Sequence, residues 1–232
     1  MSDGCRFFYL WNPSTKKFRS VAYPPGESEM MTTHGIGPDL RTRDILLIRI
    51  IKAGTLSDKK LPRAEVYSLN TNSWSRIESV PCFAYDEPTT FFNGAFHWKA
   101  INNVILYFNT AERVFRMIKL PVGCFDHIFW YHWRLAVLIG SLAFIVLGNV
   151  DVHPASSRIC DIWIMDEYGV VQTWTKLFTI PLRHAFIARP LGITLNDQLL
   201  LDLDGELICY DHYSRRDRNF HGAYNSFPLH IY

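Results

Sequence analysis

The stretch AEVYSLNTNSWSRIESVP, residues Ala64–Pro81, decides the fold class of this chain. Apolar and polar residues alternate up to Leu69, which is typical of a half-buried strand. Four turn-forming residues, Asn70–Ser73, then interrupt the alternation. It resumes from Trp74 to Val80 and ends at the proline. The stretch therefore predicts a β-hairpin.

The same pattern recurs along the chain. An apolar run leads to an Asn or Asp, and an alternating strand follows. Asn and Asp suit such turns because their side chains bond the downstream backbone and tolerate left-handed geometry. The first stretch has Asn70 at its turn, and the other copies are Phe7–Pro24 (Asn12), Val104–Pro121 (Asn109), Cys160–Pro181 (Asp166) and a weaker Gly205–Phe220 (Asp211).

A second kind of hairpin lies between these copies. Phe91–Trp98 contains Asn93-Gly94, the strongest short-range hairpin signal, and Trp133–Gly148 and Gly192–Gly205 hold the same place in later units. A full unit therefore has four antiparallel strands every ~40–50 residues, which predicts an all-β, propeller-like array. Hairpin units are expected near residues 7–24, 64–81, 91–121, 133–181 and 192–220 of a single domain covering residues 1–232. The first unit begins at its third strand, so we expect it to be incomplete and to leave an open edge.

Composition narrows the class further. The chain has 232 residues, 48% of them hydrophobic, with a formal charge of +2 that favours neither nucleic acid nor an anionic membrane as partner. Five scattered cysteines without a CxxC pair indicate free thiols in a reducing compartment. No signal peptide opens the chain, and a cytoplasmic location, with the nucleus as an additional one, is expected. The apolar run Leu135–Gly148 has 14 residues, too few for a bilayer, and Gly140-Ser141 predicts a turn between two buried strands.

The sequence contains no catalytic motif and predicts neither a metal nor a cofactor site. His127 and His132 lack a third ligand at a recognisable spacing. The densest acidic cluster is Asp202, Asp204 and Glu206, which suits a metal site or a glycosidase-like carboxylate pair, or else a hairpin turning at Asp204-Gly205. We favour the turn. His34–Asp44, HGIGPDLRTRD, contains glycines like a phosphate loop, but no helix pattern follows, so a loop leading into a strand is favoured.

Basic and aromatic residues also admit two interpretations. Three groups of basic residues are either solvated charges in loops or a surface that binds an acidic patch of a partner protein. They are Arg41/Arg43, Lys59/Lys60/Arg63 and Arg215/Arg216/Arg218. Core or inter-blade packing is favoured over ligand platforms for Trp74, Trp98, Trp163 and Trp174.

Ordered motifs carry a family resemblance. Three motifs, in this order, resemble the F-box-associated domain of plant F-box proteins, especially the S-locus F-box group. They are Trp11-Asn12-Pro13-Ser14-Thr15-Lys16, Tyr67-Ser68-Leu69 before Trp74, and Asn93-Gly94 before His97-Trp98. The likeness runs from about Phe7 to Tyr210. Ile45–Leu47 departs from the family pattern, which bears on packing rather than on function.

The resemblance implies a function class. F-box proteins are substrate receptors of Skp–cullin–F-box ubiquitin ligases, in which the F-box docks on the Skp-type adaptor and the C-terminal domain holds the target protein. In the S-locus group the targets are style ribonucleases, in pollen self-incompatibility. No segment of this chain resembles an F-box, so adaptor binding is expected only where an upstream F-box is joined to it. The alternatives are a truncated remnant or decoy without a ligase link, and a carbohydrate-acting propeller enzyme.

Loops between the units are the candidate target-binding segments, because loops on a rigid scaffold vary without disturbing the core. They are Cys82–Glu87, Gly123–His132 and Asp151–Arg158. The candidate contact residues are Tyr85, Asp86, Glu87, Tyr131 and Arg158, and Tyr and Arg are favoured at interface hot spots. The alternative is that these loops only connect strands.

Overall fold

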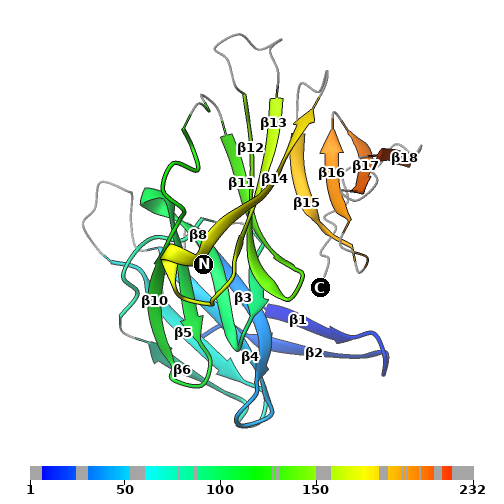
Figure 1. Ribbon diagram of the computed structural model, residues 1–232. Coiled ribbons are helices and arrows are strands. Elements are labelled where there is room, and N and C mark those ends of the chain that lie inside the picture. Colours follow the sequence, from blue (N-terminus) through cyan, green and yellow to red (C-terminus); the bar gives the residue numbers. More distant parts are fainter. Residues whose placement is uncertain are drawn as a thin grey trace.

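The structure is a computed structural model that describes residues 7–24, 31–52, 61–77, 79–85, 88–126, 128, 131–149, 158–182, 188–194, 196, 198–203, 205–211 and 216–220. Across these residues every regular element is a strand, apart from two single 3-10 turns at Ile101–Asn103 and Val171–Thr173 (Figure 1). The predicted all-β class is confirmed.

The strands form five antiparallel sheets in chain order. The first sheet has two strands, β1 (Phe7–Asn12) and β2 (Lys17–Ala22). The second has β3 (Met31–Asp39), β4 (Asp44–Lys52), β5 (Arg63–Ser68) and β6 (Ser73–Ile77). The third has β7 (Thr90–Phe92), β8 (Ala95–Ala100), β9 (Val104–Asn109) and β10 (Val114–Lys119). The fourth has β11 (Tyr131–Leu138), β12 (Ser141–Asn149), β13 (Arg158–Met165) and β14 (Trp174–Leu182), and the fifth has β15 (Ala188–Ile193), β16 (Leu199–Leu203), β17 (Glu206–Asp211) and β18 (Arg216–Phe220).

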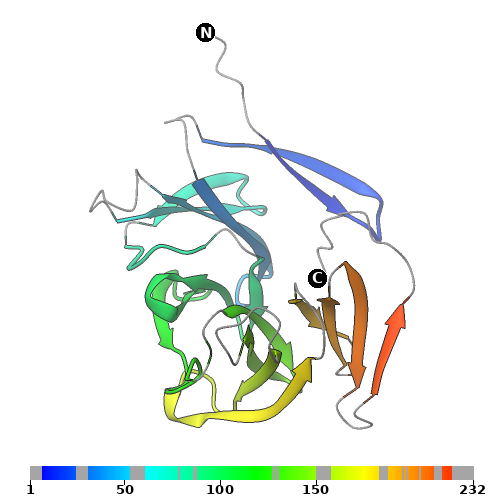
Figure 2. The ribbon, with the colours of Figure 1, turned by 90° about the horizontal axis from the view of Figure 1, so that it is seen from above.

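Each four-stranded sheet is a simple up-and-down meander, as the sequence predicts. The sheets follow one another around a common centre (Figure 2). β11, the first strand of the fourth sheet, contacts β7 of the third sheet and β15 of the fifth sheet. This is the arrangement of propeller blades. In the described part of the chain the first sheet has only the third and fourth strands of a blade, as expected from the sequence.

One turn geometry recurs at the hairpins. A four-residue turn joins β1 to β2, β3 to β4 and β9 to β10, and its first flanking residue is Asn12, Asp39 or Asn109. In each case the side-chain Oδ1 accepts hydrogen bonds from two backbone N–H groups of the turn. The backbone can therefore reverse without leaving these N–H donors unpaired. The predicted roles of Asn12 and Asn109 are confirmed.

Two turns differ from the prediction. In the β5–β6 turn the side chain of Asn70 is not the cap: Ser68 Oγ accepts the N–H of Thr71, and the Asn70 N–H donates to Asp44 on β4. The β11–β12 turn is Ile139-Gly140, one residue earlier than predicted, and both residues have positive φ, 51° and 70°. Because β-branched residues disfavour this region, nothing in the sequence pattern pointed to Ile139 as a turn residue.

The apolar run that was weighed as a membrane span forms β11 and β12, which pair with each other. No helix among the described residues combines the length and apolar character needed to cross a bilayer.

The core consists of apolar layers between successive sheets. Phe96 lies in the layer between the second and third sheets, Phe144 between the third and fourth, and Leu201 between the fourth and fifth. Val21 belongs to a smaller layer that joins the first sheet to the second. Burial of each such side chain contributes roughly 1.5–3 kcal/mol, so these layers hold the blades together.

The four tryptophans pack in the layers between sheets, as predicted, and three of them also form hydrogen bonds between sheets. Trp74, Trp98 and Trp174 each donate the indole N–H to a backbone carbonyl of the preceding sheet. The distances are 2.9 Å to Ala22, 3.3 Å to His34 and 3.1 Å to Lys119, respectively. Trp163 packs against the layer between the third and fourth sheets.

The glycines of HGIGPDLRTRD have a packing role. His34–Asp39 lies within β3 and only residues 40–43 form a turn, so the expected loop leading into a strand is wrong. A Cβ on Gly37 would lie 2.9 Å from the ring of Phe91, and one on Gly35 would lie 3.0 Å from Phe96. The glycines therefore let the second and third sheets approach closely.

Candidate functional site

The antiparallel connections place the loops at two opposite ends of the sheets. The turns between first and second strands and between third and fourth strands lie at one end, called here the turn end. The connections between second and third strands and between sheets lie at the other, called the loop end. The described strand ends that flank the three candidate loops, residues 82–87, 123–132 and 151–158, lie at the loop end. The fold therefore brings to one end strand termini that are far apart in sequence.

Tyr85 is held against the third sheet by backbone contacts. Ala84 pairs with Ala100 at the end of β8, and the Tyr85 N–H donates to the carbonyl of Lys99 at 2.8 Å. The Tyr85 side chain is exposed. A rigid backbone with an outward aromatic ring is the arrangement that lowers the entropy cost of binding a protein.

Lys99 joins Tyr85 to a neighbouring sheet. Its ammonium group lies 5.3 Å from the ring centre of Tyr85 and 5.1 Å from that of Trp133 on β11. Both distances are within cation–π range. Tyr85, Lys99 and Trp133 come from a loop, β8 and β11 and form one cluster at the loop end. Sequence reasoning found Tyr85 but missed Lys99, whose position at the end of the predicted strand AFHWKA gave no sign of the contact.

A shallow, open depression of about 330 Å³ adjoins the second candidate loop. Its lining comes from the β8–β9 connection, the start of β9, the end of β10 and the β10–β11 loop: Asn102, Asn103, Val104, Lys119, Leu120, Pro121, Gly123, Cys124, Phe125 and Asp126. The volume is at the lower limit of small-molecule pockets, which suits an inserted side chain of a partner. Asn102 and Asn103 were not predicted as site residues, although an Asn-Asn pair after a strand is a turn signal.

Short-range hydrogen bonds and buried side chains fix this loop. The Asp126 N–H donates to the Gly123 carbonyl at 3.0 Å, and the Ile128 N–H to the Phe125 carbonyl at 3.1 Å. Cys124 is buried, and burial raises the pKa of its thiol to about 11. The thiol is therefore protonated at neutral pH, which suits an anchor of the loop and not a nucleophile.

The other predicted site residues are placed in part. Asp86 and Glu87 lie outside the described residues. Tyr131 is the first residue of β11, opposite Gly148, and Arg158 is the first of β13, opposite Asn149. The structure thus brings the backbones of Tyr131 and Arg158 to the loop end of one sheet, and their side chains lie outside what it describes.

The acidic cluster forms a turn, as favoured from the sequence. Asp202 Oδ1 accepts the N–H of Gly205 at 2.8 Å, and Leu203 pairs with Glu206 across the hairpin. Asp204 lies outside the described residues. Within the described ranges no three His, Cys, Asp or Glu side chains converge as metal ligands.

His97 is buried in an inter-sheet contact. Its Nε2 lies 2.9 Å from the hydroxyl of Tyr168, in the β13–β14 turn, and its ring stacks on Tyr107. Burial disfavours the imidazolium and lowers the pKa of His97 to about 4, so the ring is neutral at physiological pH. Nothing in this arrangement requires a reacting substrate: His97 joins the third and fourth sheets.

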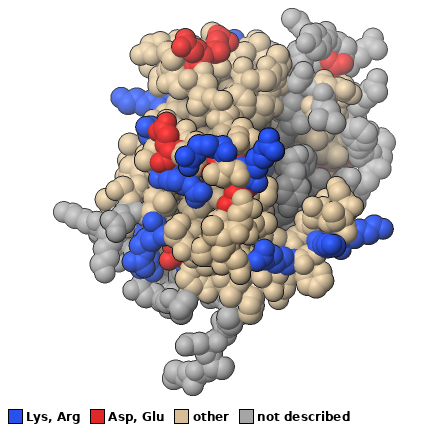
Figure 3. All heavy atoms as spheres, turned by 90° about the horizontal axis from the view of Figure 1, so that it is seen from below, with Lys and Arg blue, Asp and Glu red and all other residues tan. Residues whose placement is uncertain are grey.

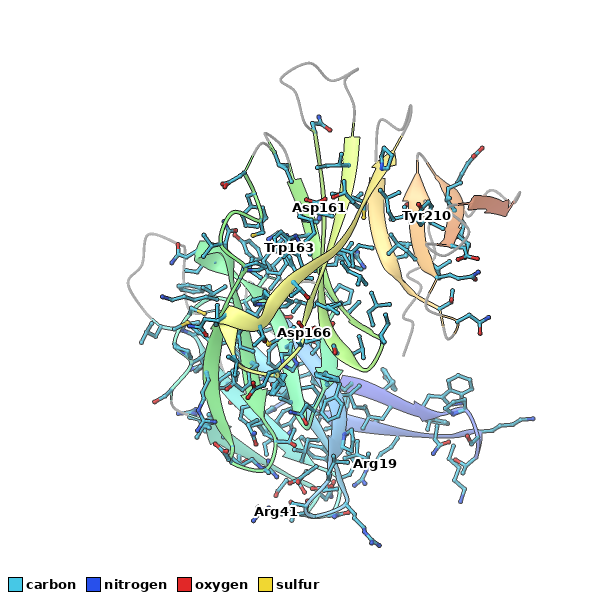
Figure 4. All side chains as sticks on the ribbon, in the orientation of Figure 1. Arg19, Arg41, Asp161, Trp163, Asp166 and Tyr210 are labelled. Atoms are coloured by element: carbon cyan, nitrogen blue, oxygen red, sulfur yellow. The ribbon has the colours of Figure 1, made fainter. Side chains whose placement is uncertain are left out.

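The turn end carries basic residues. Figure 3 shows Lys and Arg distributed over this face with a few acidic residues among them, and Figure 4 shows Arg41 at its extremity. Arg41 and Arg43 are exposed in the β3–β4 turn, whereas Arg113 contacts Asp39 at 3.4 Å. Of the other predicted basic groups, Arg63 begins β5 and Arg216 and Arg218 lie in β18, and Lys59, Lys60 and Arg215 are outside the described residues.

Comparison with known protein families identifies the family that has this architecture. The family profile of the F-box associated beta propeller domain matches residues 3–220. The chain belongs to this family. Among curated relatives of the F-box-associated domain, F-box protein CPR1 of Arabidopsis thaliana is 26% identical over 201 residues, 74% of this chain and 47% of that protein. F-box/kelch-repeat protein At3g23880 of the same organism is 25% identical over 227 residues, 90% of this chain and 57% of that protein. The F-box-associated domain here thus spans about half the length of these relatives.

Proposed function

We propose that residues 1–232 form a single, non-enzymatic domain that binds target proteins for an F-box-type ubiquitin-ligase receptor. The observation that carries the proposal is the family match over residues 3–220, together with relatives that are F-box proteins. Cytoplasm or nucleus is the expected location, since that is where such ligases act. Where an F-box is joined to the domain, it recruits the Skp-type adaptor.

The geometry of the loop end supports this role. A rigid aromatic anchor, Tyr85, is backed by Lys99 and stands on the same surface as a shallow depression and the ends of β11 and β13. Anchors of this kind beside small depressions are typical of protein interfaces. We propose that Tyr85, Asp86, Glu87, Tyr131 and Arg158 contact the target.

The finer proposal concerns the target. The resemblance to the S-locus group favours a style ribonuclease as the target. The probe is a panel of purified style ribonucleases, with an unrelated ribonuclease as the control. Binding to a style ribonuclease alone supports this target, and equal binding to both enzymes rejects it while leaving the target-binding role untouched.

Proximity labelling in plant cells tests the target-binding role itself. The full chain carries a biotin ligase, and three forms are compared: wild type, the triple variant Tyr85→Ser/Asp86→Ser/Glu87→Ser, and Leu40→Ser as a matched control. Leu40 is an exposed apolar residue at the turn end. We expect a set of labelled proteins to be lost in the triple variant and kept in the control. Identical sets in all three forms would contradict the proposed site.

The decoy alternative differs only in the ligase link. Sequencing the 5′ ends of capped transcripts shows whether an F-box is encoded in frame with this domain. An F-box in frame supports a complete receptor. A transcript without one supports a binding module or remnant that holds targets without delivering them to the ligase.

A further inference from the structure

The turn end of the first two sheets carries a group of exposed cations, called here the basic turn surface. Its members are Lys16, Lys17, Arg19, Arg41 and Arg43, and all five are exposed. Lys17 and Arg19 lie on β2, and the other three lie in the β1–β2 and β3–β4 turns. Because those three stand beyond the last paired residues of their hairpins, their exposure does not depend on which strands flank a sheet.

Hydrogen bonds between the turns hold this surface together. The guanidinium of Arg19 donates to Asn72 Oδ1, in the β5–β6 turn, at 2.5 Å. In the same turn the Asn70 N–H donates to Asp44 at 3.0 Å, and Asp44 directly follows Arg43 in the chain. Cations that are far apart in sequence therefore lie at one end of the molecule, as Figure 4 shows for Arg19 and Arg41.

The acidic residues of the first two sheets do not balance this charge at the surface. The described residues between 7 and 77 contain nine Lys or Arg and three Asp or Glu, a formal charge of +6, whereas the whole chain carries +2. The three acids, Asp39, Asp44 and Glu65, are all buried. Asp39 and Asp44 accept backbone N–H groups of the turns, and Glu65 pairs with a buried arginine. The field outside these turns is therefore positive.

Two of the cations occupy positions that the backbone reserves for other residue types. The last residue of each four-residue turn has positive φ: 55° at Lys16, 53° at Arg43 and 53° at Asn72. Gly and Asn adopt this region most readily, as Asn72 does in the β5–β6 turn. Among the described residues, no carboxylate forms an ion pair with Lys16 or Arg43. Local folding therefore gives no reason for a charged residue at either place, and the charge itself points to a partner.

We propose that the basic turn surface binds an extended acidic segment of a partner polypeptide. Guanidinium groups form paired hydrogen bonds with carboxylates, and complementary charge selects the partner and speeds the encounter. Figure 3 shows Lys and Arg side chains spread over the face seen from this end of the molecule. Because the five cations come from two turns and a strand, the segment carries several Asp or Glu residues and not a single one.

Two observations favour a polypeptide over a nucleic acid. The positive charge is confined to the first two sheets, since the whole chain carries only +2, and a long polyanion gains affinity from many cations along its path. Proteins that bind single strands also stack bases on aromatic rings among the cations. Here Lys17 and Arg19 share the face of β2 that Val21 packs on the second sheet, whereas the exposed rings of Trp11 and Phe18 lie on the opposite face.

Fluorescence anisotropy on the full chain tests the proposal. The probe is a short fluorescein-labelled peptide in which Glu alternates with Ser, and the control peptide has Gln in place of each Glu. We expect the Glu peptide to bind and the Gln peptide not to bind. Arg41→Gln/Arg43→Gln should weaken binding about fivefold at low salt, and Arg41→Lys/Arg43→Lys should retain most of it. The matched control, Arg116→Gln/Lys176→Gln, removes two cations that already form ion pairs within the fold, so it should bind like the wild type.

Arg43→Asn separates binding from folding. Asn suits the positive φ of this position, so the variant should be at least as stable as the wild type in thermal unfolding. It also removes one cation, so it should bind the Glu peptide less tightly. This inference does not depend on the proposed function, because it concerns the turn end and not the loop end.

Four results would overturn the proposal. The first is no binding of the Glu peptide, or equal binding of the Gln peptide. The second is an equal loss of affinity in Arg41→Gln/Arg43→Gln and in the matched control, which shows that only net charge matters. The third is tighter binding of a single-stranded oligonucleotide of the same length, which assigns the surface to nucleic acid. The fourth is an Arg43→Asn protein that is less stable than the wild type and binds the peptide equally well, which assigns Arg43 to folding alone.

Discussion

The buried ion pair between β4 and β5 provides a sharp test of how the second sheet is stabilised. Arg49 and Glu65 face each other across the two strands, 2.7 Å apart, with side chains 3% and 10% exposed. The guanidinium also lies 4.8 Å from the ring of Tyr23 and 5.6 Å from that of Trp74. Arg49 thus links this sheet to the segment that follows β2.

We expect Glu65→Gln to lower the free energy of unfolding by about 3–5 kcal/mol. The substitution keeps the shape of the side chain but removes the carboxylate charge that Glu65 presents to the buried guanidinium of Arg49, and breaking a buried pair costs about this much. For a domain of this size the loss corresponds to a fall in Tm of roughly 6–20 °C. The double variant Arg49→Met/Glu65→Leu removes both charges, so it should be less destabilised than Glu65→Gln.

Urea unfolding followed by tryptophan fluorescence and by circular dichroism is the assay, and coincident transitions are required before the free energies are compared. Glu112→Gln is the control, since it breaks the Arg116–Glu112 pair at 2.6 Å, whose side chains are half exposed. No measurable loss is expected there. A Glu65→Gln protein as stable as the Glu112→Gln control, or a double variant less stable than Glu65→Gln, would show that the pair does not stabilise the sheet in this way.

Three further predictions concern the interior. The pKa of His97 is lowered from 6.5 to about 4, so the unfolded chain binds the proton first as pH falls, and the free energy of unfolding should drop by about 3 kcal/mol between pH 6.5 and 4. In urea unfolding measured at several pH values, His97→Gln should flatten this pH dependence. An unchanged pH dependence would contradict burial of the neutral ring. Gly37→Ala should lower the free energy of unfolding by about 1–3 kcal/mol in thermal unfolding because the added Cβ contacts Phe91, and Phe91→Leu should recover part of this loss. A Gly37→Ala protein as stable as the wild type would show that the second and third sheets have room to move apart. Burial raises the pKa of Cys82 and Cys124 to about 11, so iodoacetamide at pH 7.5 should label both only after denaturation, as read by peptide mass spectrometry; rapid labelling of the native protein would rule this out.

Much of the fold follows from local patterns in the sequence. Period-2 alternation, Asn93-Gly94 and the turn residues Asn12 and Asn109 predicted the strands and hairpins because each depends on residues close in sequence. The turn errors have physical causes. Alternation looks the same when a register shifts, so it did not fix the turn at Ile139. Ser68 caps the β5–β6 turn instead of Asn70 because β5 ends at Ser68, which therefore holds the flanking position that Asn12 and Asn109 hold in their hairpins.

The candidate site was less accessible to sequence reasoning. Loop position identified Tyr85, but its neighbours Lys99 and Trp133 come from β8 and β11, and only the stacking of sheets brings them together. The exposure of β1 is a similar case. FFYLWN has the pattern of an ordinary half-buried strand, yet Phe7, Tyr9 and Trp11 are exposed in the structure.

The proposed role of this domain is to select proteins for ubiquitin-dependent degradation. The most direct measurement joins the F-box of a relative to the full chain in plant cells and follows the half-life of a protein captured by proximity labelling. We expect a shortened half-life that proteasome inhibition restores and that the Tyr85→Ser/Asp86→Ser/Glu87→Ser variant abolishes. A captured protein whose half-life stays the same with and without the joined F-box would contradict it.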